Sequence, residues 1–524
     1  MPEAIDLLAP LKRYWGYSAF RPLQERIVRS LLAGRDTCVV MPTGGGKSLC
    51  YQLPAVVSAG TTVVISPLIA LMQDQATQLA QMGIPAAVLN SSLGPSEQNQ
   101  VIRRAIGGSY RLLYLSPERL ARQDTVEWLA RVPVAFFAID EAHCISEWGH
   151  EFRPEYRQLS ALREHFPDQP IAAFTASATR RVRHDILAQL RLREPDRYIA
   201  SFNRPNLRYL VRQCDAPTQL RLLVSALRAH AGQNAIVYAP TVARVGETVH
   251  FLKQQGIRAI GYHGKMDPAE RQRNQESWMS DEVRVLVGTL AFGLGINKPA
   301  VRAVIHLALP KSIEQYYQEA GRAGRDGLPA DCALLWQKRD VGLLAYFIDN
   351  LNDPAEKDRA WERYHAMRRF AEAAQCRHLQ ICTHFGETPK WNTCSMCDVC
   401  APAPEWMVGR AQPEPRRRTR GRAPVKAAAP SVPHARAPGL ADHMREWRRT
   451  VAKGKGVPAY VILHDSTLDE ICLRRPSTIG ELLEISGIGA RKAEFYGREI
   501  LSVLAAFSGR PRVVRPVPDR DEPA

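Results

Sequence analysis

The sequence predicts an α/β protein with two tandem parallel-sheet lobes, followed by a helical cysteine-rich module and a small all-α bundle. Three observations support this prediction. Apolar, β-rich runs alternate with helical patterns over roughly residues 20–200 and again over 206–340, as is typical of parallel sheets covered by helices. Five of the 11 cysteines cluster between Cys376 and Cys400. Helical periodicity returns over 441–508.

Length and charge restrict the possible functions. A chain of 524 residues is too long for one hydrophobic core. Lys and Arg total 70 against 53 Asp and Glu, a net charge of +17. This excess indicates a polyanionic partner, either nucleic acid or an anionic membrane surface; a generically basic protein is the alternative. No apolar run approaches the roughly 20 residues of a membrane span. The start of the chain lacks the pattern of a signal peptide, so we expect a cytoplasmic protein with no membrane partner. We also expect a monomer.

The apolar runs locate the expected strands. In the first lobe these are 37–41, 62–66, 111–116, 135–139 and 171–175, and in the second 235–238, 258–261, 284–288, 303–307 and 330–336. The expected domains are 1–205 (first lobe), 206–340 (second lobe), 341–400 (helical, cysteine-rich module), 401–440 (linker), 441–508 (helical bundle) and 509–524 (disordered tail). The linker has eight prolines, and eight Lys or Arg against two Glu, which is typical of a flexible basic segment.

A glycine-rich loop between a predicted strand and a predicted helix indicates a phosphate-binding site. In VVMPTGGGKSLCYQ, Met41 stands where the strict pattern has its first glycine. The glycines allow backbone N–H groups to close around phosphate oxygens, the lysine adds charge at the β/γ-phosphates, and the serine hydroxyl suits Mg²⁺. The predicted ATP-binding residues of this loop are Thr43, Gly44, Gly45, Gly46, Lys47 and Ser48. The alternative is a structural glycine-rich turn.

Two carboxylates at the end of a predicted strand complete a nucleotide site. Asp140 and Glu141 follow the apolar run Phe136–Ile139, about 90 residues after Lys47. We expect Asp140 to hold Mg²⁺, and Glu141 to orient and deprotonate the attacking water. Alone, the tetrapeptide DEAH could equally be an acidic helix start.

Two arginines near the end of the second lobe suit phosphoryl transfer. Arg322 and Arg325 lie three residues apart in QEAGRAGRD, so we expect them on one face of a helix. Charge develops on the transferred phosphoryl group, and an arginine finger stabilises it. The alternative is a solvated basic helix.

The cysteine cluster indicates a metal site. Cys376, Cys394, Cys397 and Cys400 have the spacing C-x17-C-x2-C-x2-C. Four soft thiolate ligands suit tetrahedral Zn²⁺ in a closed, structural site; an iron–sulfur cluster is the alternative. Cys382 falls outside the pattern and is expected to pack as a small apolar residue.

Taken together, these motifs resemble those of superfamily 2 helicases, and further segments resemble the RecQ family. WGYSAFRPLQ is similar to the family's adenine-reading motif. That resemblance implies that Gln24 pairs with the adenine edge and that Tyr17 and Arg21 stack on its faces. Leu23 stands where the family has glycine. The two lobes are then RecA-like, the cysteine cluster is similar to the family's zinc module, and residues 441–508 resemble its HRDC domain.

One loop carries the most family-specific resemblance. SEWGHEFRPEY, residues 146–156, is similar to the aromatic-rich loop that couples single-strand contact to ATP hydrolysis, with matching residues Trp148, Phe152 and Arg153. Aromatic side chains that stack on bases grip nucleic acid without sequence preference. The alternative is a pair of core aromatics, although the flanking residues suggest an exposed loop. VGTLAFGLGINKP, residues 287–299, resembles a motif of the second lobe.

The resemblance implies a 3′-to-5′ DNA helicase that uses ATP, Mg²⁺ and Zn²⁺ and acts in DNA repair and recombination. Its expected DNA partners are single strands and forked or 3′-tailed duplexes. RecQ proteins commonly carry a winged-helix domain between the zinc module and HRDC, and the linker is too short and polar to form one. The alternatives are an RNA helicase, or a DNA-binding or strand-annealing protein with weak ATPase.

Overall fold

The computed structural model describes residues 5–90, 93–289, 298–408, 439–455, 457 and 459–508. Most of the expected linker, the expected tail and the centre of the 287–299 motif therefore lie outside the described residues. The chain divides into two units. The first comprises Met1–Leu11 and Ser18–Val425, and the second comprises Lys12–Tyr17 and Lys426–Ala524.

The first lobe is built on a parallel sheet with the strand order β3-β4-β2-β5-β6-β1-β7. In that order the strands are Ala86–Leu89, Leu112–Leu115, Thr61–Ile65, Val134–Ile139, Ile171–Thr175, Thr37–Val40 and Asp196–Ile199. Its central strands are buried on both faces, which explains their continuous apolar runs.

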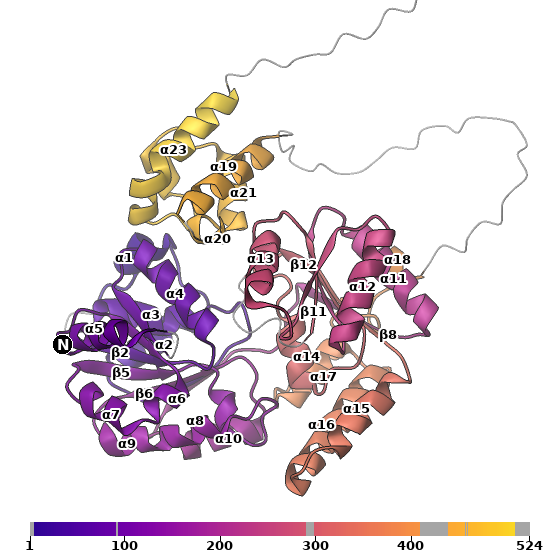
Figure 1. Cartoon of the computed structure of the whole chain (residues 1–524), viewed down its shortest axis with the longest axis horizontal. Helices are drawn as coiled ribbons and strands as arrows, with labels where there is room; N and C mark the ends of the chain where they lie inside the picture. Colours follow the sequence, from indigo (N-terminus) through magenta and orange to yellow (C-terminus); the bar gives the residue numbers. More distant parts are fainter. Residues whose placement is uncertain are drawn as a thin grey trace, which may run out of the picture. The chain divides into compact units, whose positions relative to one another are not determined.

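Helices flank this sheet on both sides (Figure 1). They are α1 Leu8–Pro10, α2 Gln24–Leu32, α3 Lys47–Val57, α4 Ile69–Gln81, α5 Pro95–Ile106, α6 Pro117–Leu120, α7 Gln123–Leu129, α8 Pro154–Arg157, α9 Leu162–His165 and α10 Arg180–Gln189. The helix α10 begins at a Thr179 cap, whose side chain accepts a hydrogen bond from the Val182 backbone N–H.

The second lobe repeats the architecture with the strand order β10-β11-β9-β12-β13-β8. These strands are Ala259–Tyr262, Val285–Gly288, Asn234–Tyr238, Val301–His306, Ala330–Trp336 and Leu207–Gln213, and its helices are α11 Ala216–Ala229, α12 Val242–Gln254, α13 Pro268–Met279 and α14 Ile313–Ala320. All strand pairs in both sheets are parallel. The expected two-lobed α/β class is confirmed.

A helical region follows the second lobe. It contains α15 Asp340–Asp349, α16 Pro354–Glu372, α17 Arg377–His384 and α18 Glu405–Val408. Asp353 caps α16, and Pro354 occupies its first turn, where the missing N–H costs nothing. An ion pair joins Arg377, at the start of α17, to Asp398 in the cysteine-rich segment. The Asp398 N–H donates to the Tyr209 carbonyl of β8.

The described C-terminal unit is an all-α bundle. Its helices are α19 Leu440–Gly454, α20 Ala459–Ile462, α21 Asp465–Arg474, α22 Ile479–Leu483 and α23 Ala490–Ser508. Leu and Ile side chains from these helices form one apolar core. Arg448 is buried there, where it donates to the Leu463 carbonyl and pairs with Asp465 at 2.8 Å. In the described part of the chain, none of the helices combines the length and apolar character that a membrane crossing requires.

Candidate active site

The glycine-rich loop lies between β1 and α3, as the sequence predicts. Gly44 and Gly46 adopt positive φ angles of 83° and 84°, a conformation that glycine reaches without strain. A Cβ on Gly46 would lie 2.3 Å from the Gln24 amide nitrogen, so a larger residue would displace that amide from the loop. The loop has the open backbone that a phosphate cradle requires.

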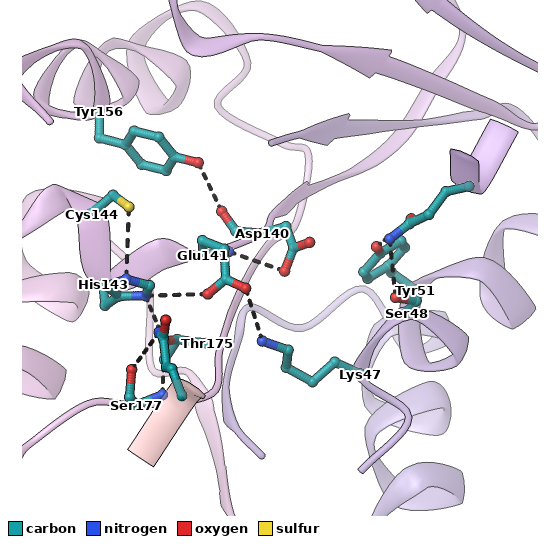
Figure 2. Close-up of polar contacts among 12 residues, drawn as sticks. Lys47, Ser48, Tyr51, Asp140, Glu141, His143, Cys144, Tyr156, Thr175 and Ser177 are labelled. Carbon is teal, nitrogen blue, oxygen red and sulfur yellow. Dashed lines mark hydrogen bonds and ion pairs between the residues drawn. The ribbon is translucent and has the colours of Figure 1, made fainter. Parts of the chain in front are cut away.

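The end of β5 faces this loop (Figure 2). Lys47 Nζ lies 3.4 Å from Glu141 Oε1. Asp140 is buried, and its Oδ1 accepts the Glu141 backbone N–H at 3.0 Å. Burial raises the pKa of Asp140 to about 6, and the adjacent Glu141 charge adds to this effect. A buried carboxylate beside a second carboxylate suits a divalent cation, so Asp140 and Ser48 fit the predicted Mg²⁺ position.

His143 extends this cluster. Its Nδ1 lies 3.3 Å from Glu141 Oε2 and 3.0 Å from Thr175 Oγ1. Burial lowers the pKa of His143, but Cys144 and Glu141 raise it more strongly, to about 10. For Glu141 the effects have the opposite signs. Burial raises the pKa of its carboxyl group, but Lys47 and His143 bring that pKa below its ordinary value. Glu141 is thus held as a carboxylate, which is the form that a general base requires.

The predicted adenine-reading residues reach the same loop in part. The Gln24 amide is buried and donates to the Gly45 and Gly46 carbonyls at 3.4 and 3.3 Å, and Arg21 donates to the Gly44 carbonyl. Tyr17 is exposed and belongs to the other unit. Leu23 has a φ of 70°, so the family's glycine position has a left-handed backbone here despite its leucine side chain.

The structure corrects the expected helical setting of the two arginines. α14 ends at Ala320, and residues 321–326 form turns. Gly324 has a φ of 54° and donates its N–H to Val301, which leaves the helical path. Arg325 packs beside Gly44, because a Cβ on that glycine would lie 3.3 Å from Arg325 Cγ. Burial, together with Arg322 and Arg204, lowers the pKa of Arg325 to about 9. The turns therefore bring cations to the phosphate loop without a helix.

Arg204 is a site residue that the sequence reasoning missed. It donates to the Thr43 carbonyl at 2.8 Å and to the Ala323 and Gly324 carbonyls at 3.3 and 3.1 Å. It therefore joins the phosphate loop of one lobe to the arginine-bearing turns of the other. Its position in SFNRPNL, at the junction of the lobes, was the available signal.

A second polar contact links the lobes through the segment after β6. The Gln318 amide of α14 donates to Ser177 Oγ at 2.8 Å. The Ser177 N–H in turn donates to Thr175 Oγ1, the same hydroxyl that contacts His143. Polar contacts therefore run from the carboxylate cluster to the second lobe.

The aromatic-rich loop directly follows this cluster and is half-buried, unlike the exposed loop that its composition suggests. Trp148 contacts the guanidinium of Arg181, whose carbon lies 3.0 Å from the ring centroid. The Arg157 guanidinium carbon lies 5.5 Å from the Phe152 ring centroid, and Arg153 pairs with Glu151 at 3.2 Å. The loop backbone also joins the cluster, because the Arg153 N–H donates to the Cys144 carbonyl.

The four predicted metal ligands come together. The sulfur atoms of Cys376, Cys394, Cys397 and Cys400 all lie within 4.8 Å of one another. Backbone N–H groups of Arg377 and Met396 donate to two of these sulfurs, as is common around metal-bound thiolates. Four converging thiols with no open position fit structural Zn²⁺. Cys382 is fully buried and stays outside the cluster.

Removing one ligand should release the metal. We expect Cys397→Ser to bind less than one zinc per chain and to melt at lower temperature, because metal binding is coupled to folding. Elemental analysis and thermal denaturation measure both effects. Cys382→Ala removes a buried thiol outside the cluster and should keep its zinc. Full zinc occupancy in Cys397→Ser would rule out this ligand set.

Comparison with known proteins gives matches along most of the chain. Residues 21–186 match the DEAD/DEAH box helicase model, and residues 218–327 match the helicase conserved C-terminal domain. Residues 338–401 match the RecQ zinc-binding model, and residues 437–504 match the HRDC domain. The expected zinc and HRDC-like regions therefore both have matching family models.

Similar proteins include two bacterial relatives. ATP-dependent DNA helicase RecQ of Haemophilus influenzae is 33% identical, covering 96% of each chain. The protein of that name from Bacillus subtilis is 31% identical, covering 95% of this chain and 98% of the relative. Dbp5 of S. cerevisiae bound to RNA has a similar structure, with a TM-score of 0.52 at 16% identity, covering 69% of this chain and 97% of that one; at that identity it supports the fold alone. The full-length identity and the zinc and HRDC matches show that this chain belongs to the RecQ family of helicases.

Proposed function

We propose that this protein is an ATP-dependent 3′-to-5′ DNA helicase that couples ATP hydrolysis to movement along single-stranded DNA. The arrangement of Lys47, Glu141 and Arg325 around one loop is the observation that carries the proposal. Relatives over the full length are named as ATP-dependent DNA helicases. A role in DNA repair and recombination is consistent with the family.

Hydrolysis follows from the site's own groups. Bound phosphates attract Lys47 away from Glu141, which leaves that carboxylate to orient water and accept its proton. Asp140 and Ser48 would hold Mg²⁺, which offsets phosphate charge when bound. Arg322 and Arg325 approach from the second lobe, so full charge stabilisation requires both lobes.

Coupling to DNA would pass through the aromatic-rich loop, because its backbone continues from the carboxylate cluster. We expect Trp148→Ala to lose most DNA stimulation while DNA-free ATPase changes little, with Phe152→Ala acting in the same direction. Steady-state ATPase against single-stranded DNA concentration measures this. Exposed Phe495 lies on α23 in the other unit, so Phe495→Ala controls for loss of an aromatic ring. Unchanged stimulation in both loop variants would make them ordinary packing residues.

Strand separation would not use a winged helix. The alignment with the H. influenzae relative runs over 597 positions, more than the 524 residues of this chain, so that relative contains segments that this chain lacks. The expected linker begins too early, because Glu405–Val408 forms α18 and Met407 packs in the core of the second lobe. We propose that the basic residues between Val408 and Gly439 add salt-dependent phosphate attraction, and that the HRDC domain raises local DNA concentration. Forked or 3′-tailed duplexes are then the preferred substrates.

The nucleic acid class can be tested directly. ATPase should rise several-fold with a single-stranded thymidine oligonucleotide and much less with the matching uridine RNA. Stronger activation by RNA would favour an RNA helicase, and no activation by either would favour a binding or annealing protein. We further propose a monomer in the cytoplasm. All 11 cysteines lack disulfides, which fits a reducing compartment.

A further inference from the structure

The aromatic-rich loop is held from outside its own lobe by one face of α16. Three consecutive loop residues contact two arginines of that helix. Arg359 Nη1 lies 3.6 Å from Glu147 Oε2, and its guanidinium carbon lies 5.5 Å from the Trp148 ring centroid. Arg363 Nη1 donates to the Gly149 carbonyl at 3.4 Å. The helix therefore contacts the loop at an acid, a ring and a backbone carbonyl.

Both arginines are fixed in place by acids at the start of α16. Arg359 pairs with Asp353 at 3.6 Å and with Glu356 at 3.1 Å, and Arg363 pairs with Glu356 at 2.7 Å. The two arginine side chains are only 12% and 18% exposed. These ion pairs already restrict the rotamers of both arginines. Contact with the loop therefore costs less side-chain conformational entropy.

Two guanidinium groups lie near the Trp148 ring: the Arg181 carbon of α10 lies 3.0 Å from the ring centroid, and the Arg359 carbon of α16 lies 5.5 Å from it. A guanidinium over an indole face is attracted by the ring quadrupole. A nucleobase stacks on that same kind of surface. Stacking of a base on Trp148 and stacking of an arginine therefore compete for the ring.

The held segment also touches the catalytic cluster. A Cβ on Gly149 would lie 2.8 Å from the His143 carbonyl oxygen and 3.0 Å from the Ser146 carbonyl oxygen. Gly149 is therefore packed tightly against the residue that contacts Glu141. Movement of Gly149 and movement of the DEAH segment are sterically linked.

We infer that Arg359 and Arg363 are positioning residues that hold Trp148 in a resting position, so that α16 sets the DNA concentration at which ATPase turns on. This inference rests on the coupling role proposed above for Trp148. DNA would have to draw Trp148 away from its contact with α16 before the ring takes a base. The helical part of the zinc module thereby controls the threshold of activation, and not the chemical step.

Arg359→Ala tests the inference, because two explanations predict opposite signs. Loss of a positive charge should in general weaken DNA binding. Loss of a contact that holds Trp148 and Glu147 should instead lower the half-saturating concentration of a thymidine oligonucleotide about three- to tenfold, with kcat at saturating DNA unchanged. Arg359→Lys keeps the charge but not the planar stack, and should lie between. Arg368→Ala removes an equal charge from α16, where Arg368 pairs only with Glu372 among the described ion pairs, and should not lower the value.

Two further measurements keep the result interpretable. Glu147→Gln leaves both arginines of α16 in place but weakens the contact of Arg359 with the loop, and should lower the half-saturating DNA concentration about twofold even if Arg359→Ala folds poorly. Glu147 also pairs with Arg157 of its own lobe at 2.9 Å, so Arg157→Ala, which removes that pair and leaves Arg359 in place, is the control and should not lower the value. Acrylamide quenching of Trp148 fluorescence, taken as the difference from Trp148→Phe, should rise in DNA-free Arg359→Ala. An unchanged or raised half-saturating concentration in both Arg359→Ala and Glu147→Gln overturns the inference. If Trp148→Ala itself keeps full DNA stimulation, the coupling role fails first, and this inference fails with it.

Discussion

Glu141→Gln should bind ATP but hydrolyse it about 10²- to 10⁴-fold more slowly, the usual contribution of a general base. The amide has nearly the shape of the carboxylate but cannot accept a proton from water. The substitution also removes the anionic partner of Lys47, whose Nζ lies 3.4 Å from Glu141 Oε1. Nucleotide affinity should therefore stay equal or rise, because Lys47 is freed for the phosphates.

Lys47→Ala should fail at an earlier step. Loss of the ammonium group removes charge at the β/γ-phosphates, so both nucleotide binding and turnover should fall. Equilibrium binding of a fluorescent ATP analogue, measured beside DNA-stimulated ATPase, separates the two variants. Glu118→Gln, an exposed position on α6, controls for loss of one carboxylate. Normal DNA-stimulated turnover in either site variant would contradict the assignment.

Arg325→Ala should lower kcat by about 10³-fold or more, the scale on which arginine fingers act. Arg325 reaches the phosphate loop from the second lobe, and the neighbouring Arg322 and Arg204 concentrate positive charge there. Phosphoryl transfer spreads negative charge over the equatorial oxygens, so the loss should affect kcat more than nucleotide affinity. Arg325→Lys should recover little, because a point charge lacks the planar fork of donors.

The matched control is Arg258→Ala, an exposed arginine of the same lobe. It should leave both kcat and the Michaelis constant unchanged. Equal losses in Arg325→Ala and in this control would indicate a general charge effect. A fall in ATP affinity with unchanged kcat would make Arg325 a binding residue without a role in the transition state.

The central strands of both sheets could be predicted from the sequence, but three of the four edge strands could not. All ten predicted strands exist, since buried parallel strands appear as continuous apolar runs. The three missed strands are β3, β7 and β8, and each lies at the edge of its sheet. Edge strands are covered on fewer sides, so charged residues interrupt their pattern, as in Asp196–Ile199 and in the end of Leu207–Gln213.

The candidate site shows a similar division. Lys47, Asp140 and Glu141 belong to local motifs that follow the carboxyl ends of two strands of the same parallel sheet, so they could be named from the sequence. Arg204 could not, because its importance depends on two carbonyls from different lobes. The helical setting expected for Arg322 and Arg325 was wrong because α14 ends at Ala320, and the Gly324 N–H donates to the Val301 carbonyl of β12 instead of continuing the helix. Contacts between lobes carry no periodicity that the sequence could reveal.

The most direct test of the proposed function is unwinding of one duplex presented with a 3′ tail, with a 5′ tail and with blunt ends. With ATP and Mg²⁺, the full chain should open the 3′-tailed duplex and leave the other two largely intact, and Glu141→Gln should open none. Opening of the blunt duplex at the same rate would show that a wedge and a duplex-docking surface exist. Faster opening of the 5′-tailed duplex would contradict the proposed polarity, and no ATP-dependent opening of any of them would contradict the helicase function itself.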